Sequence, residues 1–384
     1  MKSILSKFVS NLRINHPKAA QFSGSKGKCW FYGSPDRAPS MADYFCGHET
    51  RLSSEQRLQR AEMAAQCLSR AADGATAIYC PARDDADLPE LDGLAISVPP
   101  RIELKKTLPG TEDELMAGVR NSTTKEDLRR IRKAGFTYRV TRDPDDIRTF
   151  HANFYVPLVR QQFPDDGTIL SVDKMLEGNQ RELVCADLDG EWVGGIMNET
   201  HDTNYAMAQL GILNADETIR NSRVVSALLV RSMQRGVELG LDTTTLGFSL
   251  PFLGKGPIWF KAKWGCALQP NPNWRSMQVM LDLRHETVRQ TLADCPIIHL
   301  ENGALSVSSW LEPGEAALKA LSREAERYTG IAKWYMMGDS DTLDAAAEVL
   351  ATNDRVVPIK LEASSPDPIW LGAVLAERGA SQGA

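Results

Sequence analysis

The chain has 384 residues, 42% of them apolar and 24% charged, so it is long enough for two or three compact units of a globular protein. Its formal net charge of −6 argues against a dedicated nucleic-acid binder. The seven cysteines are scattered and form no CxxC pair, which argues against a disulfide framework or a zinc site and favours reduced thiols in a cytoplasm.

Residues 1–106 indicate an N-terminal α/β accessory region. No apolar run in the chain approaches the roughly 20 residues of a membrane span, and the first residues are too polar for a secretory signal. The stretch SSEQRLQRAEMAAQCLSRAADG has helical apolar spacing, a cap at Ser53 or Ser54, and Gly74 as a stop signal. ATAIYC and LAISVPP, which follow it, are typical of strands.

Residues 107–284 show the clearest order of elements. Thr123 and Thr124, each followed three residues later by an acidic residue, predict a capped helix that ends at Gly135. After the strand FTYRV, Asp143 and Pro144 give a strong start signal for a second helix.

Three alternating runs come next and predict an antiparallel meander: RELVCADL, EWVGGIMNET and YAMAQLGIL. The Asp189-Gly190 turn between the first two is the strongest hairpin signal in the chain. A long amphipathic helix over 217–240 follows, then a strand TTTLGF, the segment GKGPIWFKAKWGCAL, and a last strand SMQVMLDL.

Residues 285–384 alternate strand and helix and indicate a small C-terminal α/β region with few signs of its own chemistry. Because residues 1–106 also supply strands and a helix, one interpretation left open is that both ends of the chain pack into one accessory domain.

The central order resembles the GNAT acyltransferase fold, and specifically its FemAB-like branch. The resemblance is carried by EDLRRIRKAGFTYRV, FHANFYVPLVRQQF and GFSLPFLGKGPIWFKAKWGCAL, of which the last matches the closing fK..fG signature of the family. It implies an α/β (α+β) fold whose central domain has a mixed, mostly antiparallel sheet. It also implies a metal-free cytoplasmic enzyme of biosynthesis that moves an acyl or aminoacyl group to an amine of a small metabolite or of an envelope or natural-product precursor.

The donor is left open between acyl-CoA and aminoacyl-tRNA. Related enzymes bind coenzyme A at a glycine-rich turn before the long helix, where backbone N–H groups hold phosphates. Here the turn LNADETIRNSRVV contains no glycine, which puts coenzyme A in doubt and favours aminoacyl-tRNA or an unusual thioester. An anion site at this helix start would use four consecutive side chains: Arg220, Asn221, Ser222 and Arg223.

Two lysines, Lys261 and Lys263, stand among aromatic residues after a glycine-rich turn. Residues two apart point to nearly opposite sides of a helix, so we expect one lysine to face a cleft and the other to be exposed. The resemblance makes Lys261 the inward, catalytic lysine, and Lys263 is assigned to donor binding. The alternative for Lys261 is a stem on Trp259 with the ammonium group in water.

Acyl transfer to an amine needs a base and donors for the oxyanion. Glu199, at the end of the middle meander strand, is the candidate base, although it is equally typical of a charge at a hairpin end. Tyr155 is a candidate acid or a core aromatic residue. Gln209 and Ser249 are candidates for hydrogen bonds to the acyl group or the acceptor. His151 is expected on a helix surface.

A basic segment, residues 120–142, is the candidate contact for tRNA, with Arg129 and Arg130 assigned to it; a solvated helix face is the plainer interpretation. Two other functions stay open. One is an ordinary acetyl-CoA-dependent N-acetyltransferase, and the other is a non-catalytic GNAT-like module that binds a ligand or partner.

Overall fold

The computed structural model divides the chain into two compact units. Unit 1 comprises residues 1–102, 249–259 and 268–384, and unit 2 comprises residues 103–248 and 260–267. The structure describes residues 18–33, 42, 45–46, 51–58, 60–81, 87–119, 121–162, 169–177, 180–254, 256–271, 273–314, 324, 326–362 and 365–382. In these ranges no helix has the length and apolar character needed to cross a membrane.

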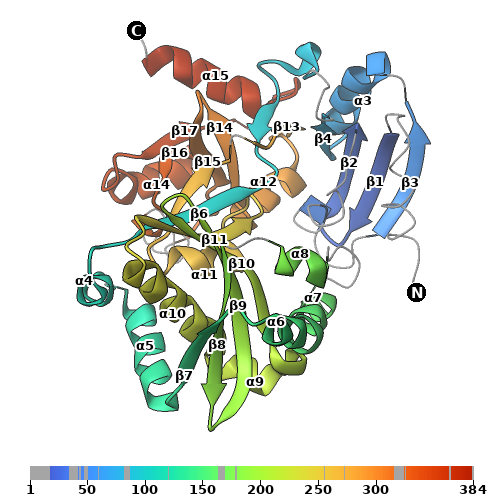
Figure 1. The fold of residues 1–384 in the computed structure, drawn as a ribbon. Coiled ribbons are helices and arrows are strands. Elements are labelled where there is room, and N and C mark those ends of the chain that lie inside the picture. The colour runs from blue at the N-terminus through green and yellow to red at the C-terminus, as the bar shows by residue number, and fades with distance from the viewer. Residues whose placement is uncertain are drawn as a thin grey trace. The chain divides into compact units, whose positions relative to one another are not determined.

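Unit 2 is built on a sheet in which six strands follow the order β6-β11-β10-β9-β8-β7. Strands β7, β8, β9 and β10 pair with their neighbours in antiparallel fashion, whereas β10 and β11 are parallel. The meander β8-β9-β10 therefore pairs consecutively, as predicted (Figure 1). The strands are β6 (Ile102–Thr107), β7 (Thr137–Thr141), β8 (Arg181–Leu188), β9 (Glu191–His201), β10 (Asn204–Ile212) and β11 (Thr243–Ser249).

Helices cover both faces of this sheet. On one face α10 packs closely, because a Cβ added at Gly194 of β9 would meet Val224 and Leu228. On the other face Phe150 and Phe154 lie against Gly195 and Gly211. The helices of unit 2 are α4 (Glu112–Ala117), α5 (Ser122–Ala134), α6 (Pro144–Phe150), the π-helix η2 (His151–Tyr155), α7 (Val156–Gln162), α8 (Val172–Leu176), η3 (Leu213–Ala215), α9 (Glu217–Asn221), α10 (Val224–Glu238) and α11 (Pro257–Ala262), which starts in unit 1.

Local signals explain several of these boundaries. Asp143 caps α6 by accepting hydrogen bonds from the next two amides, and Pro144 takes the first helical position, as predicted. Asp189 and Gly190 both have positive φ, which matches the tight turn expected between β8 and β9. Gly135 ends α5 in the left-handed conformation.

Three local predictions were wrong. Asn121, not Thr123 or Thr124, caps α5, and it does so by accepting a hydrogen bond from the amide of Thr123. The helix predicted over 217–240 is two helices, because Arg223 has a left-handed φ of 78° that interrupts it. Residues 53–57 belong to strand β3, so the first helix starts later.

Unit 1 contains a ten-stranded sheet in the order β17-β16-β15-β14-β5-β13-β4-β2-β1-β3. Most pairs are antiparallel, but β2-β4, β15-β16 and β16-β17 are parallel. Its strands are β1 (Lys18–Gly24), β2 (Gly27–Gly33), β3 (Arg51–Arg57), β4 (Thr76–Cys80), β5 (Ile96–Val98), β13 (Met277–Met280), β14 (Ile297–Glu301), β15 (Ala304–Trp310), β16 (Ile331–Gly338) and β17 (Val356–Lys360). The remaining elements are α3 (Arg60–Ala72), η1 (Pro89–Leu91), α12 (Glu286–Asp294), α14 (Ser340–Leu350), α15 (Leu371–Gln382) and β12 (Ala267–Pro270), which starts in unit 2.

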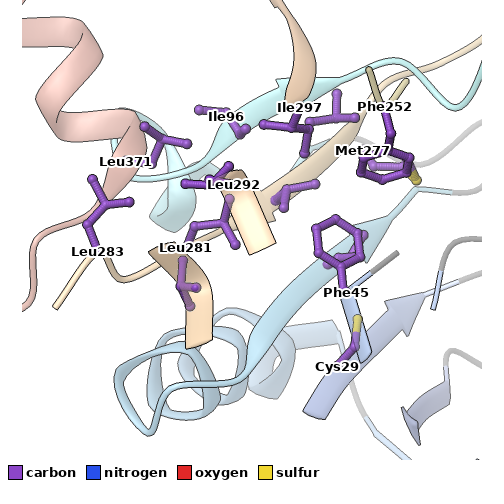
Figure 2. Packing of buried hydrophobic residues seen from close by; sticks show 14 of the residues in the cluster. Cys29, Phe45, Ile96, Phe252, Met277, Leu281, Leu283, Leu292, Ile297 and Leu371 are labelled. Carbon is purple, nitrogen blue, oxygen red and sulfur yellow. The ribbon is translucent and has the colours of Figure 1, made fainter. Parts of the chain in front are cut away.

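One core of unit 1 joins residues from distant parts of the chain. Phe45 and Phe252 meet edge to face with ring centroids 5.2 Å apart. Figure 2 shows both side chains in the buried cluster. Ile96 of β5 and Ile297 of β14 belong to the same buried cluster (Figure 2). Both ends of the chain therefore contribute to a single packed body.

The strand predicted to close the central domain belongs to the other sheet. β13 pairs with β4 and β5 of unit 1, so residues 268–284 lie outside unit 2. All four residues of β13 are buried, and burial in a sheet depends on distant partners that the local sequence does not identify.

Candidate functional site

Strands β10 and β11 are firmly joined at one end only. Three residues of β10 pair with Thr243, Thr244 and Thr245. The hydroxyls of Thr243 and Thr245 donate to the Asn204 side-chain oxygen at 3.0 and 3.1 Å, and the Thr244 hydroxyl donates to the Tyr205 carbonyl at 2.7 Å. This threonine run fixes where the two strands begin to run side by side.

Beyond residues 206 and 245 the two strands, which are described along their whole length, do not pair with each other. We call these parts of β10 and β11 the β10–β11 fork. In β10 a bulge between Met207 and Gln209 shifts the register with β9, and Ala208 between them is exposed. The facing strand edges therefore carry backbone groups that the other strand does not bind, and such edges accept an extended ligand.

The β11 arm of the fork has an unusual conformation. Gly247 takes a φ of 69°, which favours glycine, and Phe248 is 42% exposed, a large value for an aromatic side chain. The Lys261 ammonium group donates to the Phe248 carbonyl at 2.8 Å. It lies 3.9 Å from the position that a Cβ would take at Gly247. The structure thus places the Lys261 charge on the fork.

Lys263 has a different environment from the one expected. It is 8% exposed, its ammonium group donates to Asp127 at 2.6 Å, and Asp127 is itself buried. The ammonium group also lies 4.5 Å from the centre of the Phe260 ring. The expectation that the second lysine would be exposed was wrong, because an acidic partner from α5 allows its burial.

Glu199 and Gln209 lie on one face of the sheet, near the root of the fork. Glu199 is paired with Ala206, the last residue of β10 that also pairs with β11. Gln209 is paired with Met197, and residues two apart in a strand share a face. Arg181 donates to Glu199 at 3.2 Å, so the candidate base forms an ion pair.

Tyr155 is the last residue of the π-helix η2 and lies in the core rather than at an open surface. It is 7% exposed, and its hydroxyl accepts a hydrogen bond from the Leu170 amide at 3.2 Å. His151, expected on the surface, is half-buried, with its Nε2 2.9 Å from the Leu170 carbonyl. Both side chains hold the backbone that leads into α8.

The segment before α10 holds the four predicted anion-binding residues. Arg220 pairs with Glu217 at 3.2 Å, and the Ser222 hydroxyl donates to the Ile219 carbonyl. Asn221 is exposed. Arg223 occupies the cap position of α10 and provides no side-chain cap, and its Nε lies 3.6 Å from Asp127.

The two arginines assigned to tRNA contact lie on the exposed side of α5. Arg129 and Arg130 both donate to Glu126, each at 2.7 Å. These hydrogen bonds lower the pKa of Glu126 to about 2. Arg132 and Lys133 are also exposed, while Arg120 lies outside the described residues. Ser249, at the end of β11, is buried.

Glu182 is a buried charge that the sequence did not reveal. Tyr205 donates to it at 2.8 Å and Arg235 at 2.9 Å, so it links β8, β10 and α10. Burial acts to raise the pKa of Glu182, but the hydrogen bonds from Arg235 and Tyr205 outweigh it and leave the pKa below its usual value. This network stabilises α10 on the sheet beneath the fork.

Comparisons with known proteins give structural likeness only. No protein-family model and no curated protein sequence matches the chain. Similar solved structures include FemX, at 13% identity and a TM-score of 0.37 over 66% of this chain and 80% of that one. L-PGS from Bacillus licheniformis is 13% identical with a TM-score of 0.33, over 72% and 84%. An aminoglycoside acetyltransferase from an uncultured soil metagenomic sample is 16% identical with a TM-score of 0.23, over 28% and 73%.

Proposed function

We propose that this protein is an acyltransferase that moves an acyl or aminoacyl group from an activated donor to an amine. The observation that supports this proposal is the β10–β11 fork with the Lys261 ammonium group on its β11 arm. Where β10 and β11 no longer pair with each other, their facing edges can hold an amide-bearing chain, and a fixed cation beside them suits a carbonyl that becomes an oxyanion.

The reaction that fits this arrangement has simple steps. The amine nitrogen attacks the acyl carbon, and the carbonyl oxygen gains negative charge that Lys261 stabilises. The new C–N bond forms as the bond to the donor sulfur or oxygen breaks, and the leaving group takes up a proton. Glu199 is the proposed acceptor of the amine proton, with Gln209 as a hydrogen-bonding residue on the same face.

The donor is either an acyl thioester or an aminoacyl-tRNA, and the acceptor is an amine of a small metabolite or of an envelope or natural-product precursor. The N-terminus of α10 lacks a side-chain cap, which suits a phosphate group. The Asp127 carboxylate, 3.6 Å from Arg223, disfavours a multiply charged diphosphate at the same place. The uncapped helix N-terminus favours phosphate binding and the Asp127 carboxylate disfavours it, so the experiment must compare both donors.

The test is a transfer assay on the full chain with acetyl- and longer acyl-CoA in one arm and charged tRNA in the other, each with a panel of amines. Lys261→Met keeps most of the apolar stem and removes the charge, so we expect transfer to fall by roughly 100-fold, as for loss of an oxyanion donor. Lys174→Met, on the exposed surface of α8, is the matched control and should match the wild type. Equal turnover in Lys261→Met would refute the role of this lysine, and donor binding without transfer would indicate a ligand-binding module.

A further inference from the structure

Strands β15, β16 and β17 of unit 1 are parallel neighbours, so their carboxyl ends lie at one edge of the sheet (Figure 1). Trp310 is the last residue of β15, and Asp339 and Leu361 directly follow β16 and β17. All three residues line a cavity of about 290 Å³. The crevice beyond the carboxyl ends of parallel strands is a common place for ligands in α/β sheets.

A second cavity, of about 670 Å³, adjoins the first, because Glu312, Pro313 and Asp339 line both. Cavities of this size are typical of sites for small molecules. All of the lining residues belong to unit 1, and we call the two cavities together the β15–β17 cleft.

Arg289 of α12 is half-buried and lines the smaller cavity. Its guanidinium carbon lies 5.3 Å from the centre of the Trp310 ring, and its Nη1 donates to the carbonyls of Leu283 and Arg284. These contacts restrain the plane of the guanidinium group. Its Nε and Nη2 have no hydrogen-bond partner among the described residues, and their N–H groups form an edge that can bind a carboxylate in bidentate fashion.

The opposite charges around the cleft do not neutralise one another. Arg289 and Glu312 are both half-buried and line the same cavity, yet within the described parts of the chain neither forms an ion pair. The same is true of the other carboxylates at the cleft, Glu286, Asp339 and Asp341. A ligand that carries charges of both signs would give each of these groups a partner.

The start of α14 favours a cation in the larger cavity. Asp339 caps this helix by accepting a hydrogen bond from the Thr342 amide at 2.7 Å, and this bond lowers the pKa of the Asp339 carboxyl, which is therefore ionised at neutral pH. Asp341 and Glu312 line the same cavity, and its lining includes no basic residue. Such a cavity attracts a positively charged group.

We propose that the β15–β17 cleft binds a free α-amino acid that carries a second positive charge on its side chain. The carboxylate of the ligand binds the Nε and Nη2 edge of Arg289, and its α-ammonium group lies beside Glu312. The side-chain cation lies in the larger cavity with Asp339 and Asp341. The inference does not rest on the proposed acyl transfer, since none of the residues that line the cleft belongs to the fork.

The test is calorimetric titration of the full chain at low ionic strength with three probes: lysine, norleucine, which lacks the side-chain amine, and 1,5-diaminopentane, which lacks the carboxylate. We expect lysine to bind roughly fivefold more tightly than either of the others, or better. Glu312→Gln should weaken lysine binding about five- to tenfold. Glu348→Gln is the matched control, because Glu348 is exposed on α14 and does not line the cleft, and it should bind like the wild type.

Arg289→Gln tests the contact with the ligand carboxylate. This variant should bind lysine about tenfold more weakly, but it should bind 1,5-diaminopentane at least as tightly as the wild type, because that probe has no carboxylate. Arg289→Lys keeps a positive charge and should retain part of the preference for lysine over 1,5-diaminopentane. Thermal unfolding of each variant shows whether a loss of binding comes from a loss of folding.

Three outcomes would overturn the inference. Lysine does not bind the wild type, lysine binds no more tightly than norleucine, or a folded Arg289→Gln variant loses affinity for lysine and 1,5-diaminopentane to the same extent. The last result would make Arg289 a structural residue of α12 only. Because these titrations do not measure turnover, they are decisive whether or not acyl transfer is found.

Discussion

Lys261 and Lys263 are two residues apart in the chain, but their ammonium groups lie in different environments. Lys261 contacts a backbone carbonyl on the fork, whereas Lys263 is enclosed with Asp127 and aromatic rings. Thr124 adds a hydrogen bond of 3.0 Å to the Lys263 carbonyl, so α5 holds this residue by both backbone and side chain. Lys263 is therefore a residue of the packing between α5 and the end of α11.

Replacement of Lys263 by methionine should destabilise the protein. The variant leaves the Asp127 carboxylate buried with only the more distant Arg223, so we expect a loss of about 3 kcal/mol in the free energy of unfolding, measured in urea. The double variant Lys263→Met/Asp127→Leu removes both charges and should regain much of this loss. A single variant as stable as the wild type would show that the pair contributes little.

His299 should make the stability of unit 1 depend on pH. Burial lowers the pKa of His299 to about 4, against an ordinary value of 6.5, so the folded state favours the neutral ring. The Ser308 hydroxyl lies 3.0 Å from its Nε2, and Tyr335 stacks on the ring. The contribution of His299 to the stability is complete above about pH 6.5 and is lost as the pH drops toward 4. The loss amounts to about 3 kcal/mol, at about 1.36 kcal/mol per pKa unit.

The measurement is the free energy of unfolding between pH 4 and 7.5, compared between wild type and His299→Gln. Carboxylates titrate in the same range, so the difference between the two proteins is the relevant quantity. If the two curves remain parallel as the pH falls, His299 does not control this dependence.

At the scale of elements, short-range signals correctly predicted a helix start and a tight turn, because neighbouring residues determine both. Asp143 with Pro144 and Asp189 with Gly190 fix the backbone through their own side chains and φ preferences, and both predictions were confirmed. The break between α9 and α10 was missed, because a non-glycine residue in the left-handed region, here Arg223, has no simple sequence signal. β3 was taken for the start of a helix because its charged residues also fit a helical pattern.

The close packing of β10 on the π-helix gives a prediction for Gly211. A Cβ at this position would lie 2.6 Å from Phe150 and 2.7 Å from Phe154. Gly211→Ala must displace these side chains, so we expect a destabilisation of about 1 to 3 kcal/mol in chemical unfolding. Gly110→Ala is the control, since its nearest neighbour would be 3.8 Å away, and it should leave stability nearly unchanged. Comparable effects of the two changes would argue against tight packing at η2.

At the scale of the whole molecule, the sequence could not identify the fork. The fork depends on which strands are neighbours and where their pairing stops, and these are properties of contacts between distant segments. The sequence placed Glu199 and Gln209 on the meander strands, because alternation along a strand is local, and their roles stay a prediction. The sequence also did not show that β13 belongs to unit 1, because its pairing with β4 and β5 is a contact between distant segments.

The distribution of charge over the chain bears on the choice of donor. The net charge of −6 disfavours general binding of nucleic acid, so any contact with tRNA has to be local. With Arg129 and Arg130 paired to Glu126, the exposed Arg132 and Lys133 are the stronger candidates for it. If aminoacyl-tRNA is the donor, Arg132→Glu/Lys133→Glu should weaken tRNA binding and reduce the salt slope by about 2.

Filter binding at several salt concentrations measures this slope, and thermal unfolding should be nearly the same in both proteins. An unchanged affinity in the double variant would indicate that α5 is a solvated helix that does not bind tRNA.

The interrupted course of unit 1 along the chain has a consequence for synthesis on the ribosome. β5 emerges early, but its neighbours β13 and β14 emerge only after all of unit 2 has been translated. Unit 2 can therefore complete its sheet first, while β1 to β5 wait with unpaired edges. The nascent N-terminal strands are the part of this protein most in need of a chaperone, and a translation pause after residue 267 would prolong that need.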